Sequence, residues 1–221
     1  MGFRHEFKHC INTADYLTIK NRIRHVAVCD RGGEYKIRSI YFDNYNDKSL
    51  MEKVSGLNNR SKFRIRFYND DSSFIKLEKK SKVNGLCLKQ VSIITREQCE
   101  DILSGNIEFL KESDSVVSND LYLKMKNELL RPKTIVDYVR EAYIFKAGNV
   151  RVTFDKSIKS GLFSTDVFNP DLTTVETLDH RYMVLEVKYD EFLPSIINDL
   201  VQTGNRMSSS ISKYALCRMY G

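Results

Sequence analysis

Hydrophobic and polar residues alternate one by one in many short segments of this chain. In KFRIRFYN, residues 62–69, the even positions begin with three cations, Lys62, Arg64 and Arg66. The odd positions begin with three apolar residues, Phe63, Ile65 and Phe67. A period of two is typical of a β-strand, because successive side chains point to opposite faces of the sheet. The segment therefore predicts a strand with a basic face and an apolar face.

The same alternation recurs along the chain, and each such segment is predicted to be a strand. These segments are FRHEFKHCI (3–11), YKIRSIYFD (35–43), SFIKLEKKS (73–81), CLKQVSII (87–94), TIVDYVREAYIF (134–145), NVRVTFDKS (149–157) and YMVLEVKYD (182–190). Between 73–81 and 87–94, the pair Asn84-Gly85 is a strong signal for a two-residue hairpin turn. The chain is therefore expected to form an antiparallel sheet of about eight strands.

Helical spacing of apolar residues fills several of the remaining intervals. It predicts helices over 13–28, 95–104, 118–131 and 190–203, and a short helix in the terminal SSSISKYALCRMY. Thr13 is expected to cap the first helix, and Pro194 to lie in the first turn of 190–203. The region 157–181 is expected to be irregular. Because no repeat, linker or composition break appears, we expect one α+β domain over residues 1–221.

The polar faces of the predicted strands carry far more cations than acids. Twelve cations share these faces when Lys213 of the terminal helix is included: Arg4, Lys8, Lys62, Arg64, Arg66, Lys76, Lys80, Lys89, Arg140, Arg151, Lys188 and Lys213. Four acids accompany them: Glu6, Glu78, Asp155 and Glu186. Like charges on neighbouring strands destabilise a sheet. A polyanion bound along this face would offset their repulsion.

Two arrangements of the sheet are compatible with this pattern. An ordinary antiparallel sheet would expose its basic face to solvent. A sheet curled into a closed barrel, with its apolar side outward under the helices, would instead gather the cations in a tunnel. Such a tunnel must hold water and anions, because burying unpaired charge is costly. Phosphate chains suit it, since Arg binds phosphate oxygens with two N–H groups and Lys supplies point charges.

Composition narrows the classes of protein further. The chain has 35 Lys and Arg against 29 Asp and Glu, a net charge of +6, which favours an anionic partner. Its five cysteines are scattered without a C-x-x-C pair, so neither a disulfide framework nor a zinc site is indicated. No signal peptide is evident, and no apolar run approaches the roughly 20 residues of a membrane helix. We expect a soluble, cytoplasmic protein.

Two other sources of anion binding are not indicated. The chain has no GxxxxGK[ST] motif, so a P-loop is absent. It has no recognised nucleic-acid-binding motif, and its aromatic residues are expected to face away from the cations, where they cannot stack on bases. Nucleic acid is therefore not expected as a partner.

The strands, in this order, resemble the VTC domain, the polyphosphate polymerase branch of the CYTH, or triphosphate tunnel metalloenzyme, superfamily. The motifs that carry the resemblance are RHEFKHCI, IRSIYFDN, KFRIRFY, FIKLEKKSK with the following Lys89, DYVREAY, VRVTFD, LEVKYD and SISKY. They span nearly the whole chain. The resemblance implies an antiparallel tunnel lined by phosphate-binding Lys and Arg, and a metal ion held by an acid.

The resemblance also implies roles for individual residues. Its phosphate-binding positions fall on Lys8, Arg64, Arg66, Lys80, Lys89, Arg140 and Arg151, and its metal-binding glutamate falls on Glu186. Ser212 and Lys213 would lie at the end of the tunnel. Two positions depart from the pattern. Arg4 stands where the wider superfamily has the first acid of Glu-x-Glu-x-Lys, which favours the VTC branch over hydrolases and cyclases. Ser210 stands where the eukaryotic VTC pattern has a lysine.

These observations together predict metal-dependent phosphoryl transfer, with polyphosphate made from ATP or another triphosphate. Lys8, Arg64 and Arg66 are expected to contact the transferring phosphate. The rest of the phosphate chain is assigned to Lys62, Lys76, Lys80, Lys89, Arg140, Arg151, Lys188, Lys213 and Ser212. Glu186, with Glu6, is expected to hold Mn²⁺ or Mg²⁺.

Several alternatives stay open from the sequence. An inorganic or nucleoside triphosphatase could use the same residues, and so could a non-catalytic module that binds polyphosphate or inositol phosphates. Arg38 is equally compatible with the tunnel and with the outer face, whereas Asp155 is expected to pair with a nearby cation rather than to bind metal. The resemblance makes a membrane-protein partner possible, because VTC-type catalytic domains can belong to membrane assemblies. The sequence does not indicate the nucleotide, which of the two metals is bound, the product length or the oligomeric state.

Overall fold

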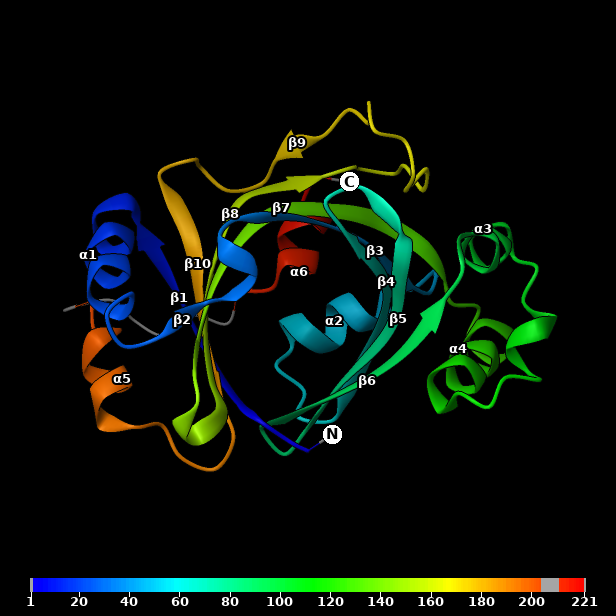
Figure 1. Ribbon diagram of the computed structural model, residues 1–221. Helices are drawn as coiled ribbons and strands as arrows, with labels where there is room; N and C mark the ends of the chain where they lie inside the picture. Colours follow the sequence, from blue (N-terminus) through cyan, green and yellow to red (C-terminus); the bar gives the residue numbers. More distant parts are fainter. Residues whose placement is uncertain (1, 204–210, 221) are drawn as a thin grey trace.

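The computed structural model describes residues 2–203 and 211–220, and an antiparallel sheet dominates them (Figure 1). Eight strands form one hydrogen-bonded path, in the order β1-β10-β8-β7-β3-β4-β5-β6. Their bounds in that order are β1 (His5–Asn12), β10 (Tyr182–Tyr189), β8 (Val150–Ser160), β7 (Arg131–Phe145), β3 (Tyr35–Asp43), β4 (Arg60–Tyr68), β5 (Asp71–Val83) and β6 (Leu86–Ile94). Two short strands, β2 (Val28–Cys29) and β9 (Val175–Glu176), pair with β7 and β8. The eight predicted strands are thus confirmed.

The sheet curls until its first and last strands meet at one point. Arg4, directly before β1, exchanges two backbone hydrogen bonds of 3.0 Å with Cys87 of β6. Beyond this bridge the chain leads from β1 to α1 and from β6 to α3, on opposite sides of the molecule (Figure 1). Within the described ranges no further backbone pairing joins β1 to β6. The curled antiparallel sheet is confirmed, whereas the predicted closure into a full barrel is not shown.

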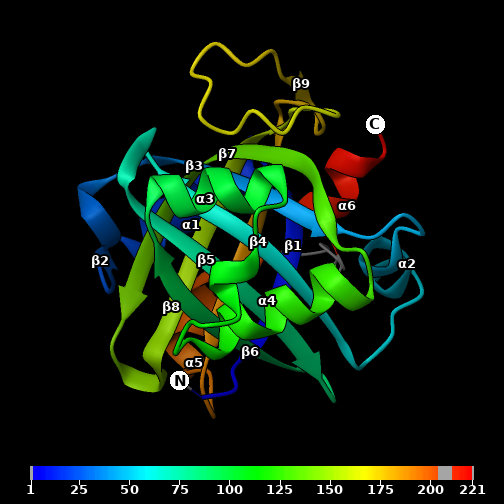
Figure 2. The same ribbon diagram turned by 90° about the vertical axis from the view of Figure 1, so that its right-hand side faces the viewer.

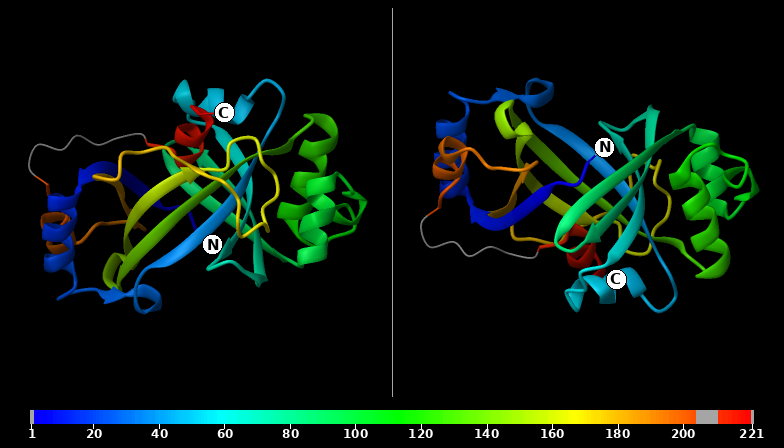
Figure 3. Two further views of the ribbon diagram at one scale, coloured as in Figure 1. Left: turned by 90° about the horizontal axis from the view of Figure 1, so that it is seen from above. Right: turned by 90° about the horizontal axis from the view of Figure 1, so that it is seen from below.

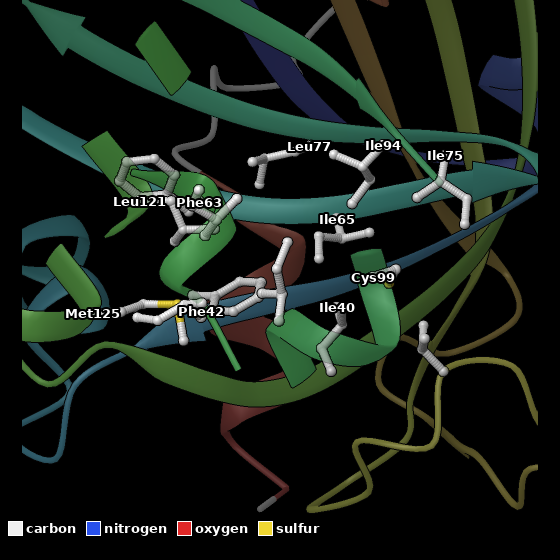
Figure 4. Close-up of a cluster of buried hydrophobic side chains, with 14 of the residues drawn as sticks. Ile40, Phe42, Phe63, Ile65, Ile75, Leu77, Ile94, Cys99, Leu121 and Met125 are labelled. Atoms are coloured by element: carbon white, nitrogen blue, oxygen red, sulfur yellow. The ribbon is translucent and has the colours of Figure 1, made fainter. Parts of the chain in front are cut away.

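Helices cover the outer face of the sheet in two groups (Figures 1 and 2). On β3–β6 lie α3 (Arg96–Ser104) and α4 (Val116–Asn127), joined by η2 (Glu108–Leu110). The apolar side chains between these helices and the strands form one core cluster, which includes Phe63, Ile65, Leu77 and Leu121 (Figure 4). On the other part of the sheet lie α1 (Thr13–Ile23) and α5 (Ser195–Leu200), which cover Phe154, Leu185 and Val187. The apolar face of the sheet therefore points outward, under the helices.

Two short helices, α2 (Lys48–Val54) and α6 (Lys213–Arg218), lie at one end of the curled sheet, whereas β2 lies at the other end (Figures 2 and 3). Asp43, the last residue of β3, links the two helices. Its carboxylate accepts hydrogen bonds from the backbone N–H groups of Ser49 and Leu50, at 2.9 and 3.1 Å, and from the Tyr214 hydroxyl at 2.6 Å. The end of the sheet is thereby tied to both helices.

Several local predictions are refined by the structure. The hairpin turn is confirmed, because Asn84 and Gly85 both have positive φ, 47° and 85°. Thr13 is not the cap of α1, because Asn12 accepts the Asp15 N–H at 2.9 Å and forms a capping box. The helix predicted over 190–203 is short and begins after Pro194. The region 157–181 is irregular only in part, since β8 continues to Ser160 and β9 pairs with it.

The remaining short elements are η1 (Asp30–Gly32) and η3 (Ala147–Asn149). None of the helices in the described part of the chain combines the length and the apolar composition that crossing a bilayer requires.

Candidate functional site

A cavity of about 440 Å³ lies inside the curled sheet, and we call it the inner cavity. In the described part of the chain thirteen lysines and arginines line it, against only three acids, Glu6, Asp30 and Glu186. All fourteen candidate site residues from the sequence, from Glu6 to Lys213, are among its lining residues. The polar faces of the strands therefore point inward, so of the two arrangements compatible with the alternation the structure has the one with the cations inside the curled sheet. The roles of these residues in binding or catalysis stay predictions.

The register of β4 against β5 arranges the basic residues in opposed pairs. Lys62 lies opposite Lys80, and Arg66 lies opposite Lys76. Between these two pairs Arg64 lies opposite Glu78, a carboxylate that is 1% exposed. Because residues two apart face the same side of a strand, these pairs form a continuous basic row along the cavity wall.

Glu78 holds three cations of this wall. One of its oxygens accepts from Arg64 Nε at 2.7 Å, and the other lies 2.6 Å from Lys89 Nζ and 3.9 Å from Arg66. Burial alone would raise the pKa of Glu78, but Arg64, Arg66 and Lys89 lower it well below the usual range. Glu78 is therefore ionised at neutral pH and orients the cations beside it.

Glu6 of β1 and Glu186 of β10 are the second acidic group of the cavity. Lys8 Nζ lies 2.8 Å from Glu6 Oε1 and 3.2 Å from Glu186 Oε1. Lys80 lies 2.7 Å from Glu6, and Lys188 lies 2.8 Å from Glu186. Burial and the charge of Glu186 oppose ionisation of Glu6, yet the three lysines lower its pKa to about 2. The two carboxylates are thus charged and neutralised by ammonium groups.

Asp155 of β8 is the third buried acid next to the cavity. It accepts two hydrogen bonds from Arg140, at 2.6 and 2.8 Å, and forms an ion pair with Lys213 of α6. Burial would raise the pKa of Asp155, but Arg140 and Lys213 lower it to about 2. The expected pairing of Asp155 with nearby cations is present. Ser212 caps α6 by accepting the Ala215 N–H at 3.4 Å, while Ser210 lies outside the described residues.

Two lysines of the cavity differ from the others. Within residues 2–203 and 211–220, neither Lys62 nor Lys76 forms an ion pair with an acid; Lys62 lies 5.3 Å from the centre of the Tyr41 ring, and Lys76 lies 5.4 Å from that of Tyr68. Burial, together with the charges of Lys80, Lys8 and Arg64, lowers the pKa of Lys62 to about 7, although Tyr41 acts in the opposite direction. An anion bound here would favour the charged form of Lys62.

Four tyrosines also line the cavity, Tyr35, Tyr41, Tyr68 and Tyr138. The prediction that the aromatic residues face away from the cations is wrong for these four. Their hydroxyls take part in the basic network, since Arg64 donates to Tyr41 and Arg66 donates to Tyr138, both at 2.8 Å. The alternation in KFRIRFYN could have predicted the position of Tyr68, because Tyr68 is an even position of the strand, like Lys62 and Arg66, and so points to the same side.

Two further placements could not be decided from the sequence. Arg38 does not line the cavity. Its Nε and Nη2 atoms donate hydrogen bonds to the Asp137 carboxylate, at 2.9 and 2.8 Å. Asp30 and Arg31 do line the cavity, from the turn of η1. Asp30 forms an ion pair with Arg151, and the Arg31 guanidinium lies 4.5 Å from the centre of the Tyr68 ring.

A curled antiparallel sheet with basic side chains inside and helices outside is the class of architecture that the triphosphate tunnel resemblance implies. The profile described as the VTC domain matches residues 3–220. The chain therefore belongs to the VTC domain family.

Other comparisons give only remote likenesses. Comparison with curated proteins finds no match. Among solved structures, the PH1819 protein from Pyrococcus horikoshii OT3 has 16% identity and a TM-score of 0.42, covering 90% of this chain and 84% of that one. A protein from Vibrio parahaemolyticus described as a "putative adenylate cyclase" has 10% identity and a TM-score of 0.45, and the match covers 89% of this chain and 81% of that one. A protein from Bacillus halodurans with the same description has 14% identity and a TM-score of 0.42, and the match covers 85% of this chain and 82% of that one. TM-scores below 0.5 carry no weight for fold or activity.

Proposed function

We propose that the inner cavity binds the phosphate chain of ATP or another triphosphate, and that the protein makes polyphosphate by metal-dependent phosphoryl transfer. The observation that carries this proposal is the lining, in which thirteen cations among the described residues face three acids inside the sheet. A volume of about 440 Å³ is within the usual size of a small-molecule site. A phosphate chain is the ligand that such a density of Lys and Arg suits best.

Strands β1 and β4 supply the groups proposed to contact the transferring phosphate. Arg64 and Arg66 are held by Glu78, Tyr41 and Tyr138, so their guanidinium groups are oriented before a ligand binds. Lys8 forms ion pairs with Glu6 and Glu186, the two acids that we call the acidic pair. Preorganised donors of this kind stabilise charge that develops on phosphate oxygens in the transition state.

The acidic pair fits a hard divalent cation such as Mn²⁺ or Mg²⁺. Glu6 and Glu186 provide carboxylate oxygens, and both stay ionised because the lysines lower their pKa values. Within the described residues no cluster of three or more His, Cys, Asp or Glu gathers that could hold the ion alone. Ions of this type commonly take one or two carboxylates and complete their shell with substrate phosphates. The bound ion would neutralise charge on the phosphate oxygens.

The proposed reaction needs no side-chain nucleophile. An oxygen of inorganic phosphate, or of the end of a growing chain, forms a bond to the γ-phosphorus of ATP. The bond from that phosphorus to its bridging oxygen breaks, and ADP leaves with the electron pair. The lysines and arginines act by positioning both phosphates in line and by neutralising their charge. If water replaces the acceptor, the same cavity would serve a triphosphatase.

The test is to incubate the purified protein with ATP and Mn²⁺ and to separate long-chain polyphosphate from free phosphate. Long-chain product supports the proposal, and free phosphate alone supports the triphosphatase. Glu186→Gln should abolish turnover while ATP binding persists, whereas Glu112→Ala, at an exposed acid far from the cavity, should leave turnover unchanged. If the protein binds ATP but forms neither polyphosphate nor free phosphate, an enzymatic role is contradicted and a binding module is favoured.

A further inference from the structure

A second cavity, of about 380 Å³, adjoins the inner cavity at its α2 end, and we call it the α2 cavity. The two cavities share six lining residues, Glu6, Lys8, Lys62, Lys80, Cys87 and Ser212. The α2 cavity is also lined by Ser49 and Lys53 of α2 and by Tyr214 of α6. A ligand in the inner cavity can therefore extend past Lys62 and Lys80 into this second space.

Three cations line the α2 cavity but not the inner cavity: Lys53, Arg60 and Lys82. Arg60 and Lys82 lie opposite each other on β4 and β5, one step beyond the pair of Lys62 and Lys80. Because residues two apart on a strand share a face, the basic row of the inner cavity continues outward through them. The path from Arg66 and Lys76 to Arg60 and Lys82 spans six residues, about 20 Å of strand.

None of these three cations forms an ion pair in the described part of the chain, although Glu52 and Glu128 line a neighbouring cavity together with Arg60 and Lys82. The Arg60 guanidinium donates a hydrogen bond to the Leu57 carbonyl. Burial lowers the pKa of Lys53, and the charges of Arg60, Lys8 and Lys82 lower it further. Three such cations beside an open cavity repel one another, and an anion bound between them would relieve this repulsion.

The opposite end of the inner cavity, near β2, is different. There Arg151 of the cavity lining forms an ion pair with Asp30, and Arg31 lies against the Tyr68 ring. The basic row of β4 and β5 also ends there, since Tyr68 lies opposite Asp71. The basic row of β4 and β5 therefore continues beyond the inner cavity toward α2 and not toward β2. Figure 2 shows α2 and β2 at opposite ends of the sheet.

We propose that Lys53, Arg60 and Lys82 bind the distal phosphates of a polyphosphate chain whose reacting end lies in the inner cavity. The proposal rests on the proposed function, and it adds a direction, because the growing chain leaves the cavity on the α2 side. A triphosphate is too short to reach these residues from the phosphates held by Arg64 and Arg66. A long chain contacts both groups.

The test compares two probes, inorganic tripolyphosphate and a long-chain polyphosphate, by isothermal titration calorimetry. The variant is Lys53→Ala/Arg60→Ala/Lys82→Ala in the full chain. We expect its affinity for tripolyphosphate to stay within about twofold of wild type, and its affinity for the long chain to fall by about tenfold or more, since three charge-assisted contacts are lost. The control is Arg22→Ala/Arg24→Ala/Lys111→Ala, which removes three exposed charges elsewhere and should change neither affinity.

The outcomes separate this inference from the proposed function. If wild type binds both probes and the α2-cavity variant keeps its long-chain affinity, this inference alone is wrong. It is also wrong if the variant loses affinity for both probes equally. If the control variant loses as much long-chain affinity as the α2-cavity variant, the loss reflects net charge, and this inference is wrong as well. If wild type binds neither probe, the proposed function is contradicted, and this inference with it.

Discussion

Lys8 and Glu186 lie opposite each other in the register of β1 and β10, and their side chains form an ion pair of 3.2 Å. The same ammonium lies 2.8 Å from Glu6, so one lysine joins both acids of the inner cavity. Lys8 therefore occupies the position from which a divalent cation would be attracted. Metal binding and Lys8 are expected to compete unless phosphate draws the ammonium away.

Lys8→Met should change metal and nucleotide binding in opposite directions. Loss of the ammonium leaves Glu6 and Glu186 less neutralised, so Mn²⁺ in the absence of phosphate should bind roughly tenfold more tightly. ATP should bind roughly tenfold or more weakly, because a phosphate contact is lost. Electron paramagnetic resonance of Mn²⁺ and calorimetry of ATP measure the two effects. Mn²⁺ affinity that does not change would contradict this role of Lys8.

Polyphosphate binding should take up a proton on Lys62 above neutral pH. In the ligand-free protein burial lowers the pKa of Lys62 to about 7, so the side chain is largely neutral at higher pH. A bound polyanion favours the ammonium form and raises this pKa. Affinity is therefore highest below pH 7 and falls as pH rises, by at most about tenfold per pH unit for one proton.

Calorimetry at pH 7.5 in two buffers of different ionisation enthalpy measures this proton uptake. The Lys62→Arg variant carries a permanent positive charge at this position, so it should take up fewer protons when polyphosphate binds. Lys188, whose pKa burial lowers to about 8, should keep part of the uptake in that variant. Equal uptake in wild type and Lys62→Arg would show that Lys62 does not change its charge on binding.

Glu78→Gln should destabilise the ligand-free protein more than the protein with bound ligand. The buried carboxylate neutralises Arg64 and Lys89, so its loss leaves uncompensated charge and should lower the free energy of unfolding by roughly 3–5 kcal/mol. Tripolyphosphate would restore negative charge beside these cations, and the deficit should shrink. Chemical denaturation with and without tripolyphosphate gives both numbers, and a deficit that the ligand leaves unchanged would argue against phosphate at this wall.

Arg38 and Arg66 form a matched pair of buried arginines on adjacent strands, 3% and 4% exposed. Arg38→Met leaves Asp137 buried without its cation and should lower the free energy of unfolding by roughly 3–5 kcal/mol. Its affinity for tripolyphosphate should not change, because Arg38 lies outside the cavity. Arg66→Met should instead lower the affinity for tripolyphosphate by roughly tenfold or more. Denaturation and calorimetry distinguish the two, and equal binding losses would place the ligand elsewhere.

Much of the site could be predicted because alternation decides which face of a strand a residue occupies. In β4 the outward Phe63, Ile65 and Phe67 are buried under helices, and this fixes Lys62, Arg64 and Arg66 on the inner face. The same contrast holds along β1, β5 and β10. The candidate lining residues could therefore be named before their neighbours in space were known.

Other features depend on contacts that no local pattern contains. β3 is buried on both faces, so its alternation could not decide where Arg38 points. The seven-residue α2 is too short for a clear apolar period, and its first turn is held by the Asp43 carboxylate, which accepts from the N–H groups of Ser49 and Leu50. Asp30 and Arg31 reach the cavity through a turn in which Arg31 has φ 55°. Among the described residues, the single bridge between the two ends of the curled sheet joins Arg4 to Cys87, which are far apart in the sequence.

A crystal structure with bound inorganic tripolyphosphate tests the central claim most directly, namely that the inward-facing cations hold a phosphate chain. The predicted result is density for the phosphates inside the curled sheet, within hydrogen-bonding distance of Arg64 and Arg66. Density confined to the outer surface, or an inner cavity without phosphate at saturating ligand, would contradict it.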